Sequence, residues 1–417
     1  MLPTMTTSTT PVATPAPAER ARTLHAELAR YPASTFTFDP RMAEGWLSDR
    51  YFQRTAATLA HAGRSPRVTM QLFAKQHGIV AGVYEAIRLL QTQLASPAPD
   101  GRRYTLRDFR IETLLEGDAI APWDTVMWIT GPYVAFAHLE TPYLGVLARR
   151  SLVATNVRRV MDAAAGKPVI YMGARHDDWR VQTPDGFAAM VGGAGAVSSH
   201  AGGAWWGAKG VGTMPHSMIA CFGGDVAAAS VAFTRYVHAH EPGTQVVVLV
   251  DYNNDCVGDA LAAARAMRDE FGPGALAGVR LDTSEKLVDR SLEPLAGSEP
   301  RRKLSGVVPE LVVNVRAALD AEGFGDVGIW VSGGFTPAKI RRFEEAGVPV
   351  AGYGVGSSLL GHNRGEEDGL INGFDYTADI VAVDGRAESK VGRLARPNAR
   401  LVTLDVEELE RLDGARA

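Results

Sequence analysis

The stretch GIWVSGGFTPAKIRRFEEAGVPVAGYGVGSS, residues 328–358, holds the pattern that decides the fold. It contains two candidate strands, GIWVSGG and VAGYGVG, each of which ends in a glycine-rich loop, with an amphipathic helical segment between them. An apolar strand, a helix and a second apolar strand are typical of a parallel sheet covered by helices. The two glycine-rich loops then lie at one edge of the sheet, where exposed backbone N–H groups suit an anion. The stretch therefore predicts a phosphorylated ligand.

The same unit of apolar strand, polar loop and helix repeats along the chain from Lys167 onward. Five further candidate strands precede the quoted stretch, and they are PVIYMG, AVSSH, KGVGTM, QVVVLVD and AGVRLD. Nearly all-apolar strands that alternate with helices indicate parallel pairing, and this many units predicts a full or partial barrel. We therefore expect an α/β barrel in residues 151–365.

The rest of the chain has different sequence patterns. Residues 1–20 are rich in Thr, Pro and Ala, so they bury too little apolar surface to offset their ordering entropy, and we expect a disordered tail. Residues 21–150 combine helical spacing with short alternating strands, which predicts an α+β domain. Residues 366–417 begin with a strand and a turn, and we expect this segment to return toward the N-terminal domain. Helices are expected over residues 45–63, 78–94 and 140–164, and a strand over 66–75.

The composition favours a globular enzyme with small-molecule partners. The chain has 417 residues, of which 46% are hydrophobic and 22% charged, and its formal net charge is -4. These values allow a sizeable core and argue against a broad nucleic-acid-binding surface. Cys221 and Cys256 have no neighbouring Cys or His at metal-site spacing, so neither a disulfide framework nor a structural zinc site is expected. No apolar run is long enough for a membrane span and no signal peptide is recognisable, so we expect a cytoplasmic protein.

Polar and charged residues collect at the predicted strand ends. In α/β barrels the loops after the strands converge on one mouth, so we expect these residues to lie together. The strand-end groups are Arg175-His176, Ser198-Ser199-His200, His216-Ser217, Asp251, Arg280, Asp282, Ser332-Gly333-Gly334 and Gly354 to Ser358.

These strand-end residues suit different parts of a phosphorylated ligand. Asp251 and Asp282 end apolar strands, where a carboxylate needs a metal ion, sugar hydroxyls or a cation beside it. His216 can act as a nucleophile toward a phosphoryl group or as a general base. Arg175 can pair with a planar carboxylate or a pyrophosphate. Each residue taken singly also fits a structural role, such as an Asp that caps the following helix.

In this order the motifs resemble those of the type II phosphoribosyltransferases, most closely the nicotinate phosphoribosyltransferases of the archaeal-like branch. The likeness runs from about Ser48 to Arg393. Its landmarks are SDRYFQRT, VAGVYEAI, YMGARHDD, GGAGAVSS, GTMPHSMI, LVDYNND, GVRLDT, VSGGFTPAKI, GYGVGSSL and DYTADIVAVDGR. The resemblance implies an irregular, partly open, seven-stranded α/β barrel behind an N-terminal α/β domain. It also implies a head-to-tail homodimer in which each active site borrows the partner's N-terminal domain.

The resemblance assigns roles to the strand-end residues. It matches Arg175 to the carboxylate of the base, Arg280 and Asp282 to the base and ribose, and Asp251 to the ribose. It makes Asp251 and Asp282 the candidate Mg²⁺ ligands, and it makes His216 the residue that ATP phosphorylates. The other expected contacts are a 5′-phosphate cradle of Gly333, Gly334, Gly356, Ser357 and Ser358, the substrate-binding Ser198 and Ser332, and the stacking aromatics Tyr51 and Phe52.

Two positions depart from the family pattern. Met172 stands where an aromatic residue usually precedes the glycine of the Arg175 motif, so we expect a one-sided stack on the base. Val197 stands where nicotinamide-preferring relatives carry an Asp. Valine offers no acceptor for an amide N–H₂, which favours an acid as the substrate.

The reaction that the resemblance implies joins nicotinate to phosphoribosyl pyrophosphate with coupled ATP hydrolysis, which forms nicotinate mononucleotide and pyrophosphate for NAD salvage. Three alternatives stay open: a quinolinate phosphoribosyltransferase, a secondary-metabolism paralogue that uses another aromatic acid, and a non-catalytic metabolite sensor. The histidine of GTMPHS speaks against the quinolinate enzyme. The retained pair Asp251 and Asp282, together with His216, speaks against the sensor.

Overall fold

The computed structural model describes residues 16–95, 101–362 and 369–415, and the chain divides into two compact units. Unit 1 consists of residues 1–148 and 375–417, and unit 2 consists of residues 149–374. The two segments of unit 1 are therefore far apart in sequence.

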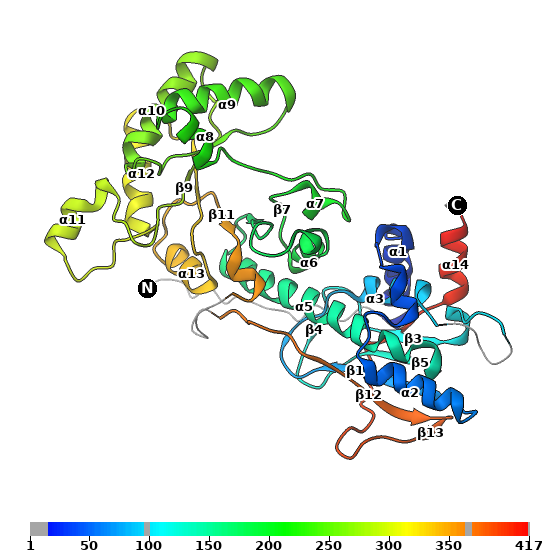
Figure 1. The fold of residues 1–417 in the computed structure, drawn as a ribbon. Helices are drawn as coiled ribbons and strands as arrows, with labels where there is room; N and C mark the ends of the chain where they lie inside the picture. The colour runs from blue at the N-terminus through cyan, green and yellow to red at the C-terminus, as the bar shows by residue number, and fades with distance from the viewer. Residues whose placement is uncertain (1–15, 96–100, 363–368, 416–417) are drawn as a thin grey trace. The chain divides into compact units, whose positions relative to one another are not determined.

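An antiparallel sheet of six strands forms the centre of unit 1 (Figure 1). In spatial order its strands are β13 (Arg386–Ala387), β12 (Tyr376–Val383), β1 (Arg67–Ala74), β5 (Thr125–Pro132), β3 (Arg110–Thr113) and β14 (Val402–Thr403). The strand expected over 66–75 is confirmed as β1, the partner of both β12 and β5. The C-terminal segment supplies β12, β13 and β14, so this sheet needs both ends of the chain.

Helices and a small two-stranded sheet complete unit 1. The helices are α1 (Pro17–Arg30), α2 (Arg50–His61), α3 (Val83–Thr92), α4 (Tyr133–Phe136) and α14 (Val406–Gly414), and the small sheet pairs β2 (Gly78–Ile79) with β4 (Ala119–Ile120). The helix expected over 140–164 is confirmed as α5 (Glu140–Ala163), within which the two units meet in sequence. The helices expected over 45–63 and 78–94 form, but they are shorter, as α2 and α3.

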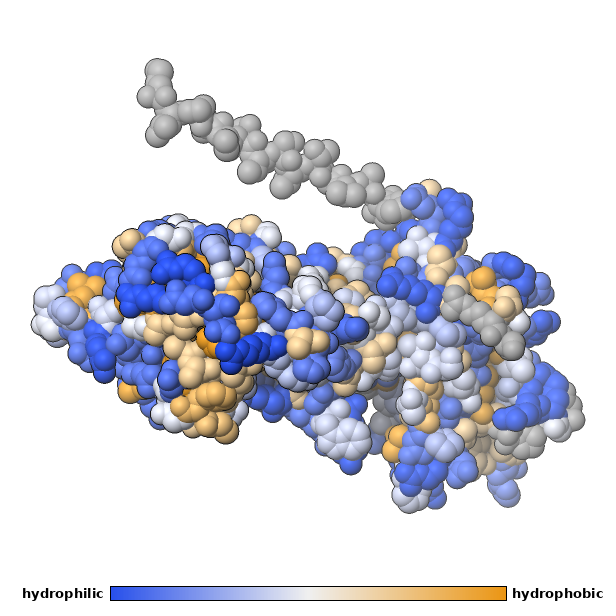
Figure 2. Space-filling view, turned by 90° about the horizontal axis from the view of Figure 1, so that it is seen from above, coloured by the Kyte–Doolittle hydropathy of each residue, from blue (hydrophilic) through white to orange (hydrophobic). Residues whose placement is uncertain are grey.

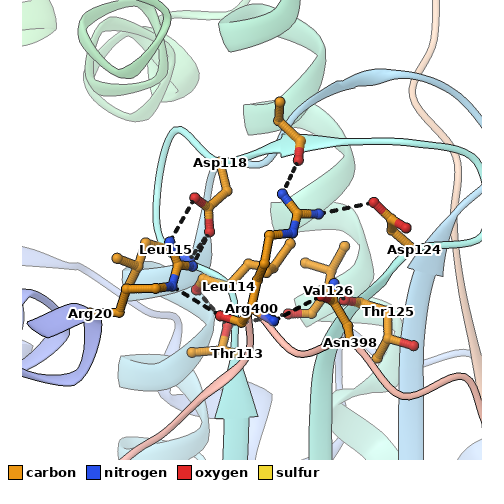
Figure 3. A network of polar contacts seen from close by, with 11 residues as sticks. Arg20, Thr113, Leu114, Leu115, Asp118, Asp124, Thr125, Val126, Asn398 and Arg400 are labelled. Carbon is orange, nitrogen blue, oxygen red and sulfur yellow. Dashed lines mark hydrogen bonds and ion pairs between the residues drawn. The ribbon is translucent and has the colours of Figure 1, made fainter. Parts of the chain in front are cut away.

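A polar network in unit 1 corrects the expected limit of the N-terminal tail (Figure 3). Residues 1–15 lie outside the described part of the chain, but α1 already begins at Pro17, so the tail predicted through residue 20 was too long. Arg20 is buried, makes an ion pair with Asp118, and donates from Nε to the Arg400 carbonyl oxygen at 3.0 Å. Arg400 in turn donates to the Asp124 carboxylate at 3.0 Å. Composition missed this because the partners of Arg20 are about 100 and 380 residues away.

A parallel sheet of six strands forms the core of unit 2. In spatial order its strands are β7 (Ala196–Val197), β6 (Val169–Tyr171), β11 (Gly352–Val355), β10 (Gly328–Val331), β9 (Gly278–Leu281) and β8 (Val247–Leu249). Figure 1 shows this sheet with its connecting helices, α6 to α13, between and around the strands. The sheet curls into a half-barrel, so the α/β class and the partly open barrel are confirmed.

The expected strand KGVGTM does not form, and the number of barrel strands is six rather than seven. Residues 209–214 run between β7 and β8 without joining either ladder. The Val211 N–H donates to the Val197 carbonyl at 2.8 Å, and the Met214 N–H donates to the Val247 carbonyl at 3.2 Å. Two glycines in this hexapeptide weaken its preference for a strand, because glycine loses the most backbone entropy on ordering. The sheet therefore stays open at this edge.

The helices of unit 2 are α6 (Gln182–Gly192), α7 (His200–Gly203), α8 (His216–Cys221), α9 (Val226–His240), α10 (Cys256–Phe271), α11 (Glu293–Ser298), α12 (Pro309–Ala321) and α13 (Pro337–Glu345). Several begin at a capping side chain that accepts a backbone N–H, as Asp225 does for α9, Asp255 for α10 and Thr336 for α13. The strands and the inner helix faces share one apolar core. This packing holds the strand ends in a defined arrangement.

The visible surface is mainly hydrophilic, with smaller hydrophobic patches between the hydrophilic regions (Figure 2). Within the described parts of the chain, none of the helices combines the length and the apolar character that a membrane crossing requires. Trp46, Leu47 and Tyr51 are among the exposed large hydrophobic residues of unit 1.

Candidate active site at the strand ends

Residues from four neighbouring strands meet at the carboxyl ends of the parallel sheet in unit 2. The pairing register places Val331 of β10 beside Leu281 of β9 and beside Tyr353 of β11. Asp282 and Ser332, which directly follow β9 and β10, therefore lie at the same level. Since loops after parallel strands project from one edge, this register brings the predicted polar residues together.

Arg280 on β9 is the centre of a hydrogen-bonded network. Its Nε donates to Thr213 Oγ1 at 2.9 Å, and its Nη1 donates to Ser332 Oγ at 2.8 Å. Nη1 also lies 3.4 Å from Asp282 Oδ2, and the Ser332 hydroxyl donates to Asp282 Oδ1 at 2.8 Å. The Arg280 side chain is only 13% exposed, and burial lowers the pKa of its guanidinium. The network holds one cation and one carboxylate in fixed positions.

His216 and Asp251 form a second pair. His216 is the first residue of α8, and its Nε2 lies 3.1 Å and 3.2 Å from the two carboxylate oxygens of Asp251. The Asp251 side chain is 6% exposed, whereas that of His216 is 46% exposed. The hydrogen bond to Asp251 raises the pKa of the imidazole, and the charge of Asp282 acts in the same direction. A carboxylate that orients one ring nitrogen of an accessible imidazole is the arrangement that nucleophilic or acid–base chemistry requires.

The two glycine-rich loops lie beside these pairs. Gly333 and Gly334 have φ angles of +88° and +63°, which favour glycine, and a Cβ on Gly333 would lie 3.1 Å from Asp282 Oδ1. A Cβ on Gly356 would lie 2.8 Å from His176 Cε1. Glycine therefore lets the backbone come close to its neighbours at all three positions. The Ser358 hydroxyl donates to the Phe335 carbonyl at 2.9 Å, which ties one loop to the other, while Ser357 is exposed.

Arg175 and Met172 follow β6 on the other side of β11. Arg175 is exposed and has neither an ion-pair nor a hydrogen-bond partner among the described residues. Its charge lowers the pKa of both His176 and Arg280, so it lies within electrostatic reach of the network. The Met172 thioether packs on Gly354, where an added Cβ would lie 2.8 Å from the sulfur atom. A guanidinium and an apolar thioether that follow the same strand are groups that suit a flat ring carrying a carboxylate.

Other predicted residues have mainly local roles or lie elsewhere. Ser198 donates its backbone N–H to the Tyr171 carbonyl at 3.0 Å, and His200 Nδ1 accepts the Gly210 N–H at 3.1 Å. Tyr51 and Phe52 lie on α2 of unit 1, with ring centroids 4.2 Å apart. Tyr51 is 58% exposed and Phe52 8%, and neither belongs to the cluster that unit 2 builds by itself.

Two residues of the site were not singled out from the sequence. Thr213 lies in the GTMPHS motif, three residues before His216, but a threonine hydroxyl in a glycine-rich segment carries no signal of its own. Lys339 on α13 donates from Nζ to the Gly333 carbonyl at 2.9 Å. Its position in TPAKI is that of an ordinary helix residue. Only the packing of α13 against the glycine loop identifies it.

Comparison with known proteins agrees with this arrangement. Residues 49–151 match the family described as quinolinate phosphoribosyl transferase, N-terminal domain. The nicotinate phosphoribosyltransferase pncB1 of Mycobacterium tuberculosis is 28% identical over 343 residues, which cover 76% of this chain and 69% of that protein.

Among solved structures, nicotinate-nucleotide pyrophosphorylase from Pyrococcus furiosus is 27% identical, with a TM-score of 0.69 over 89% of this chain and 86% of that one. Human nicotinic acid phosphoribosyltransferase shares the fold, with a TM-score of 0.60, 20% identity, and coverage of 84% of this chain and 77% of that one. Over most of its length, the chain is therefore similar in sequence and in fold to proteins named nicotinate phosphoribosyltransferase, and its N-terminal part matches the quinolinate phosphoribosyl transferase family model.

Proposed function

We propose that this protein transfers the phosphoribosyl group of phosphoribosyl pyrophosphate to nicotinate, coupled to ATP hydrolysis, as a step of NAD salvage in the cytoplasm. The observation that carries the proposal is the Arg280–Ser332–Asp282 network beside the left-handed Gly333–Gly334 turn. This arrangement offers backbone N–H groups for a phosphate, a carboxylate for ribose hydroxyls and fixed cations for the pyrophosphate and the base.

In the proposed reaction the pyridine nitrogen of nicotinate forms a bond to ribose C1 while the bond from C1 to the pyrophosphate oxygen breaks. Pyrophosphate leaves with the electron pair of that bond. Arg175, which has no partner among the described side chains, would pair with the nicotinate carboxylate. Holding the two reactants in line is the main contribution of such a site, since proximity alone can supply about 7–11 kcal/mol of the barrier.

Val197 and Met172 bear on the choice of base. Val197 is 1% exposed, and its side chain offers no acceptor for an amide N–H₂. Met172 presents a flexible thioether in place of a flat ring. The proposal therefore assigns an aromatic acid rather than an amide as the base.

The donors at the strand ends fit a magnesium ion that arrives with a substrate pyrophosphate. No cluster of three or more His, Cys, Asp or Glu side chains within the described ranges could hold a metal by itself. Mg²⁺ is often held by one or two carboxylates together with substrate phosphates, and Asp251 and Asp282 are the proposed carboxylates, since the charges of both act on His216. When bound, Mg²⁺ would neutralise charge on the leaving pyrophosphate.

His216 is the proposed phosphoryl acceptor in the ATP-coupled step. Asp251 holds Nε2 of the imidazole, and the ring is about half exposed, so it is accessible to a γ-phosphate. The phosphoryl group would pass from ATP to a ring nitrogen and then to water, which releases ADP and phosphate. Transient phosphorylation beside Arg280 and Asp282 would change the charge of the site during each cycle.

A head-to-tail homodimer is part of the proposal. Tyr51 is 58% exposed on α2, next to the exposed Trp46 and Leu47. An exposed aromatic ring on one copy could stack on a base that is bound at the strand ends of a second copy. Phe52, which contacts Tyr51 and is buried, would support that ring.

The test is incubation of the protein with phosphoribosyl pyrophosphate, Mg²⁺ and ATP, with nicotinate, quinolinate or nicotinamide supplied in turn. The expected result is mononucleotide from nicotinate, accompanied by phosphate release. Mononucleotide and CO₂ from quinolinate would support the quinolinate alternative. Product from none of the three would refute the proposal in favour of another aromatic acid or a sensor.

His216→Ala tests the ATP-coupled step, with His240→Ala on α9 as the matched control. The expected result is loss of ATP hydrolysis in His216→Ala, while slow transfer of the base persists, and no change in His240→Ala. Undiminished ATP hydrolysis in His216→Ala would exclude the role proposed for this residue.

A further inference from the structure

A cavity of about 210 Å³ shares Gly334 with the proposed phosphate cradle, and its charged lining residues are not among those assigned to the reaction. Residues of the 303–308 loop, Glu285 after β9 and the first turns of α13 form its walls. The polar residues that line it are Glu285, Lys303, Ser305, Thr336, Lys339 and Arg342. Three of these six are cations and one is an acid, so the cavity carries an excess of positive charge.

The three cations are not neutralised by ion pairs. Lys303 and Arg342 are exposed, and neither has an ion-pair or hydrogen-bond partner among the described residues. Among the described residues, Lys339 Nζ has only the Gly333 carbonyl as a hydrogen-bond acceptor, at 2.9 Å, and it lies 4.3 Å from the centroid of the Phe335 ring. Burial, aided by the charges of Lys303 and Arg342 and opposed by that of Glu285, lowers the pKa of Lys339 to about 8. Gathering like charges in this way is unfavourable unless an anion joins them.

The size and chemistry of the cavity select the anion. At about 210 Å³ the space is smaller than the roughly 300–1,000 Å³ of sites that enclose a whole drug-sized ligand, so it suits a single small group. Two ammonium groups and a guanidinium match the charge and the acceptor oxygens of a phosphate, and the Ser305 hydroxyl adds a donor. Glu285 would repel a second acidic group and so limits the charge that the cavity accepts.

We propose that Lys303, Lys339 and Arg342 bind a phosphate group at a second site, which shares the wall at Gly334 with the proposed phosphate cradle, and that its occupancy regulates the Gly333–Gly334 turn. The link between the two sites is Lys339, because its ammonium group holds the Gly333 carbonyl while it faces the cavity. A phosphate in the cavity would compete for that ammonium group and loosen the turn. The ligand is either inorganic phosphate or the phosphate of a small ester.

The experiment measures equilibrium binding of radiolabelled inorganic phosphate to the full-length protein by dialysis. The test variant is Lys303→Gln with Arg342→Gln. The control is Arg301→Gln with Arg341→Gln, which removes the same charge from exposed residues of the same two segments that do not line the cavity. All four side chains are exposed, so both double variants should keep the thermal unfolding midpoint of the parent protein.

The expected result is at least a tenfold loss of affinity for one equivalent of phosphate in the Lys303 and Arg342 variant, and less than a twofold change in the control. Equal losses in both variants, or no loss in either, would overturn the proposal, since the binding would then follow net charge or the glycine loops alone. The difference between two variants with intact glycine loops does not depend on catalysis. It therefore stays interpretable even if mononucleotide is never formed.

A competition arm identifies the source of the phosphate group. Ribose 5-phosphate is added at increasing concentration to the parent protein and to the Lys303 and Arg342 variant. The quantity followed is the difference in bound phosphate between the two proteins. Loss of that difference assigns the site to a phosphate ester, and its persistence assigns the site to inorganic phosphate. Absence of any such difference from the start is again the result that overturns the proposal.

Discussion

Replacing Arg280 with lysine would keep the positive charge at the end of β9 but break the geometry of the network. The guanidinium donates to Thr213 from Nε at 2.9 Å and to Ser332 from Nη1 at 2.8 Å, in two directions. A lysine ammonium is a single point donor on a flexible stem and cannot reproduce this planar fork. We expect Arg280→Lys to lose one of the two hydrogen bonds and to leave Asp282 less firmly held.

The magnitude follows from the number of bonds lost. A hydrogen bond from a charged donor contributes about 1.5–3 kcal/mol, so losing one lowers kcat/KM for phosphoribosyl pyrophosphate by about 10-fold to 150-fold. The Arg280 side chain is only 13% exposed, so water replaces the lost partner poorly and the upper part of this range applies. The assay is initial-rate formation of mononucleotide from nicotinate at several concentrations of phosphoribosyl pyrophosphate.

Thr213→Val makes the test specific to the network, because it removes the same Nε bond from the acceptor side without touching any charge. If the bond acts as described, the double variant Arg280→Lys with Thr213→Val should be little worse than Arg280→Lys alone. Rates within threefold of the parent protein for Arg280→Lys, or effects that simply add in the double variant, would refute this reasoning.

Three further predictions test other parts of the molecule. Gly334→Ala forces an L side chain into φ +63°, with its Cβ against the Glu285 carboxylate, which costs about 1–3 kcal/mol of strain. This strain should raise KM for phosphoribosyl pyrophosphate about tenfold or more. An unchanged KM would contradict the proposed phosphate turn. Glu140 is buried beside two other carboxylates, and its pKa is raised from the ordinary 4.5 to about 8. The folded state therefore holds a proton that the unfolded chain releases between about pH 4.5 and 8, and stability falls as the pH rises through that window, by up to about 1.4 kcal/mol per pH unit. Urea unfolding of Glu140→Gln should lack this decline, and identical pH profiles for the two proteins would exclude it. Asp413→Ala leaves the fully buried guanidinium of Arg88 without this ion pair and should destabilise unit 1 by about 2–3 kcal/mol. Asp413→Asn is the control and should have a smaller effect. An unchanged urea midpoint in Asp413→Ala would contradict this prediction.

The fold of unit 2 was largely predictable because its signal is local. Each parallel strand is a short apolar run bounded by polar or glycine residues, and the helices between the strands have their own periodicity. The one strand that failed, KGVGTM, was assigned from two apolar residues and its spacing to its neighbours. Residues 209–214 would form a strand only if β7 and β8 lay close enough to pair with them, and a local sequence pattern does not determine that distance.

The candidate site was predictable in its members but not in its contacts. Arg280 lies near the end of a strand, and Asp251, Asp282 and Ser332 follow strands, so all four were expected at one mouth for that reason alone. Which of them touch was decided by the register of β9 against β10, and the result is a hydroxyl that links a guanidinium to a carboxylate. Thr213 joined the network because the open segment before His216 passes over Arg280.

By itself, the sequence determined the kinds of element, their order and the chemistry placed at each strand end, because those properties depend on residues a few positions apart. The tertiary structure alone decided the six-stranded order of the open barrel, the joining of β12 and β14 to a sheet that begins 300 residues earlier, and the cationic cavity beside Gly334. The physical reason is the same in each case. These features arise where segments distant in the chain pack together, and the free energy of that packing belongs to no one segment.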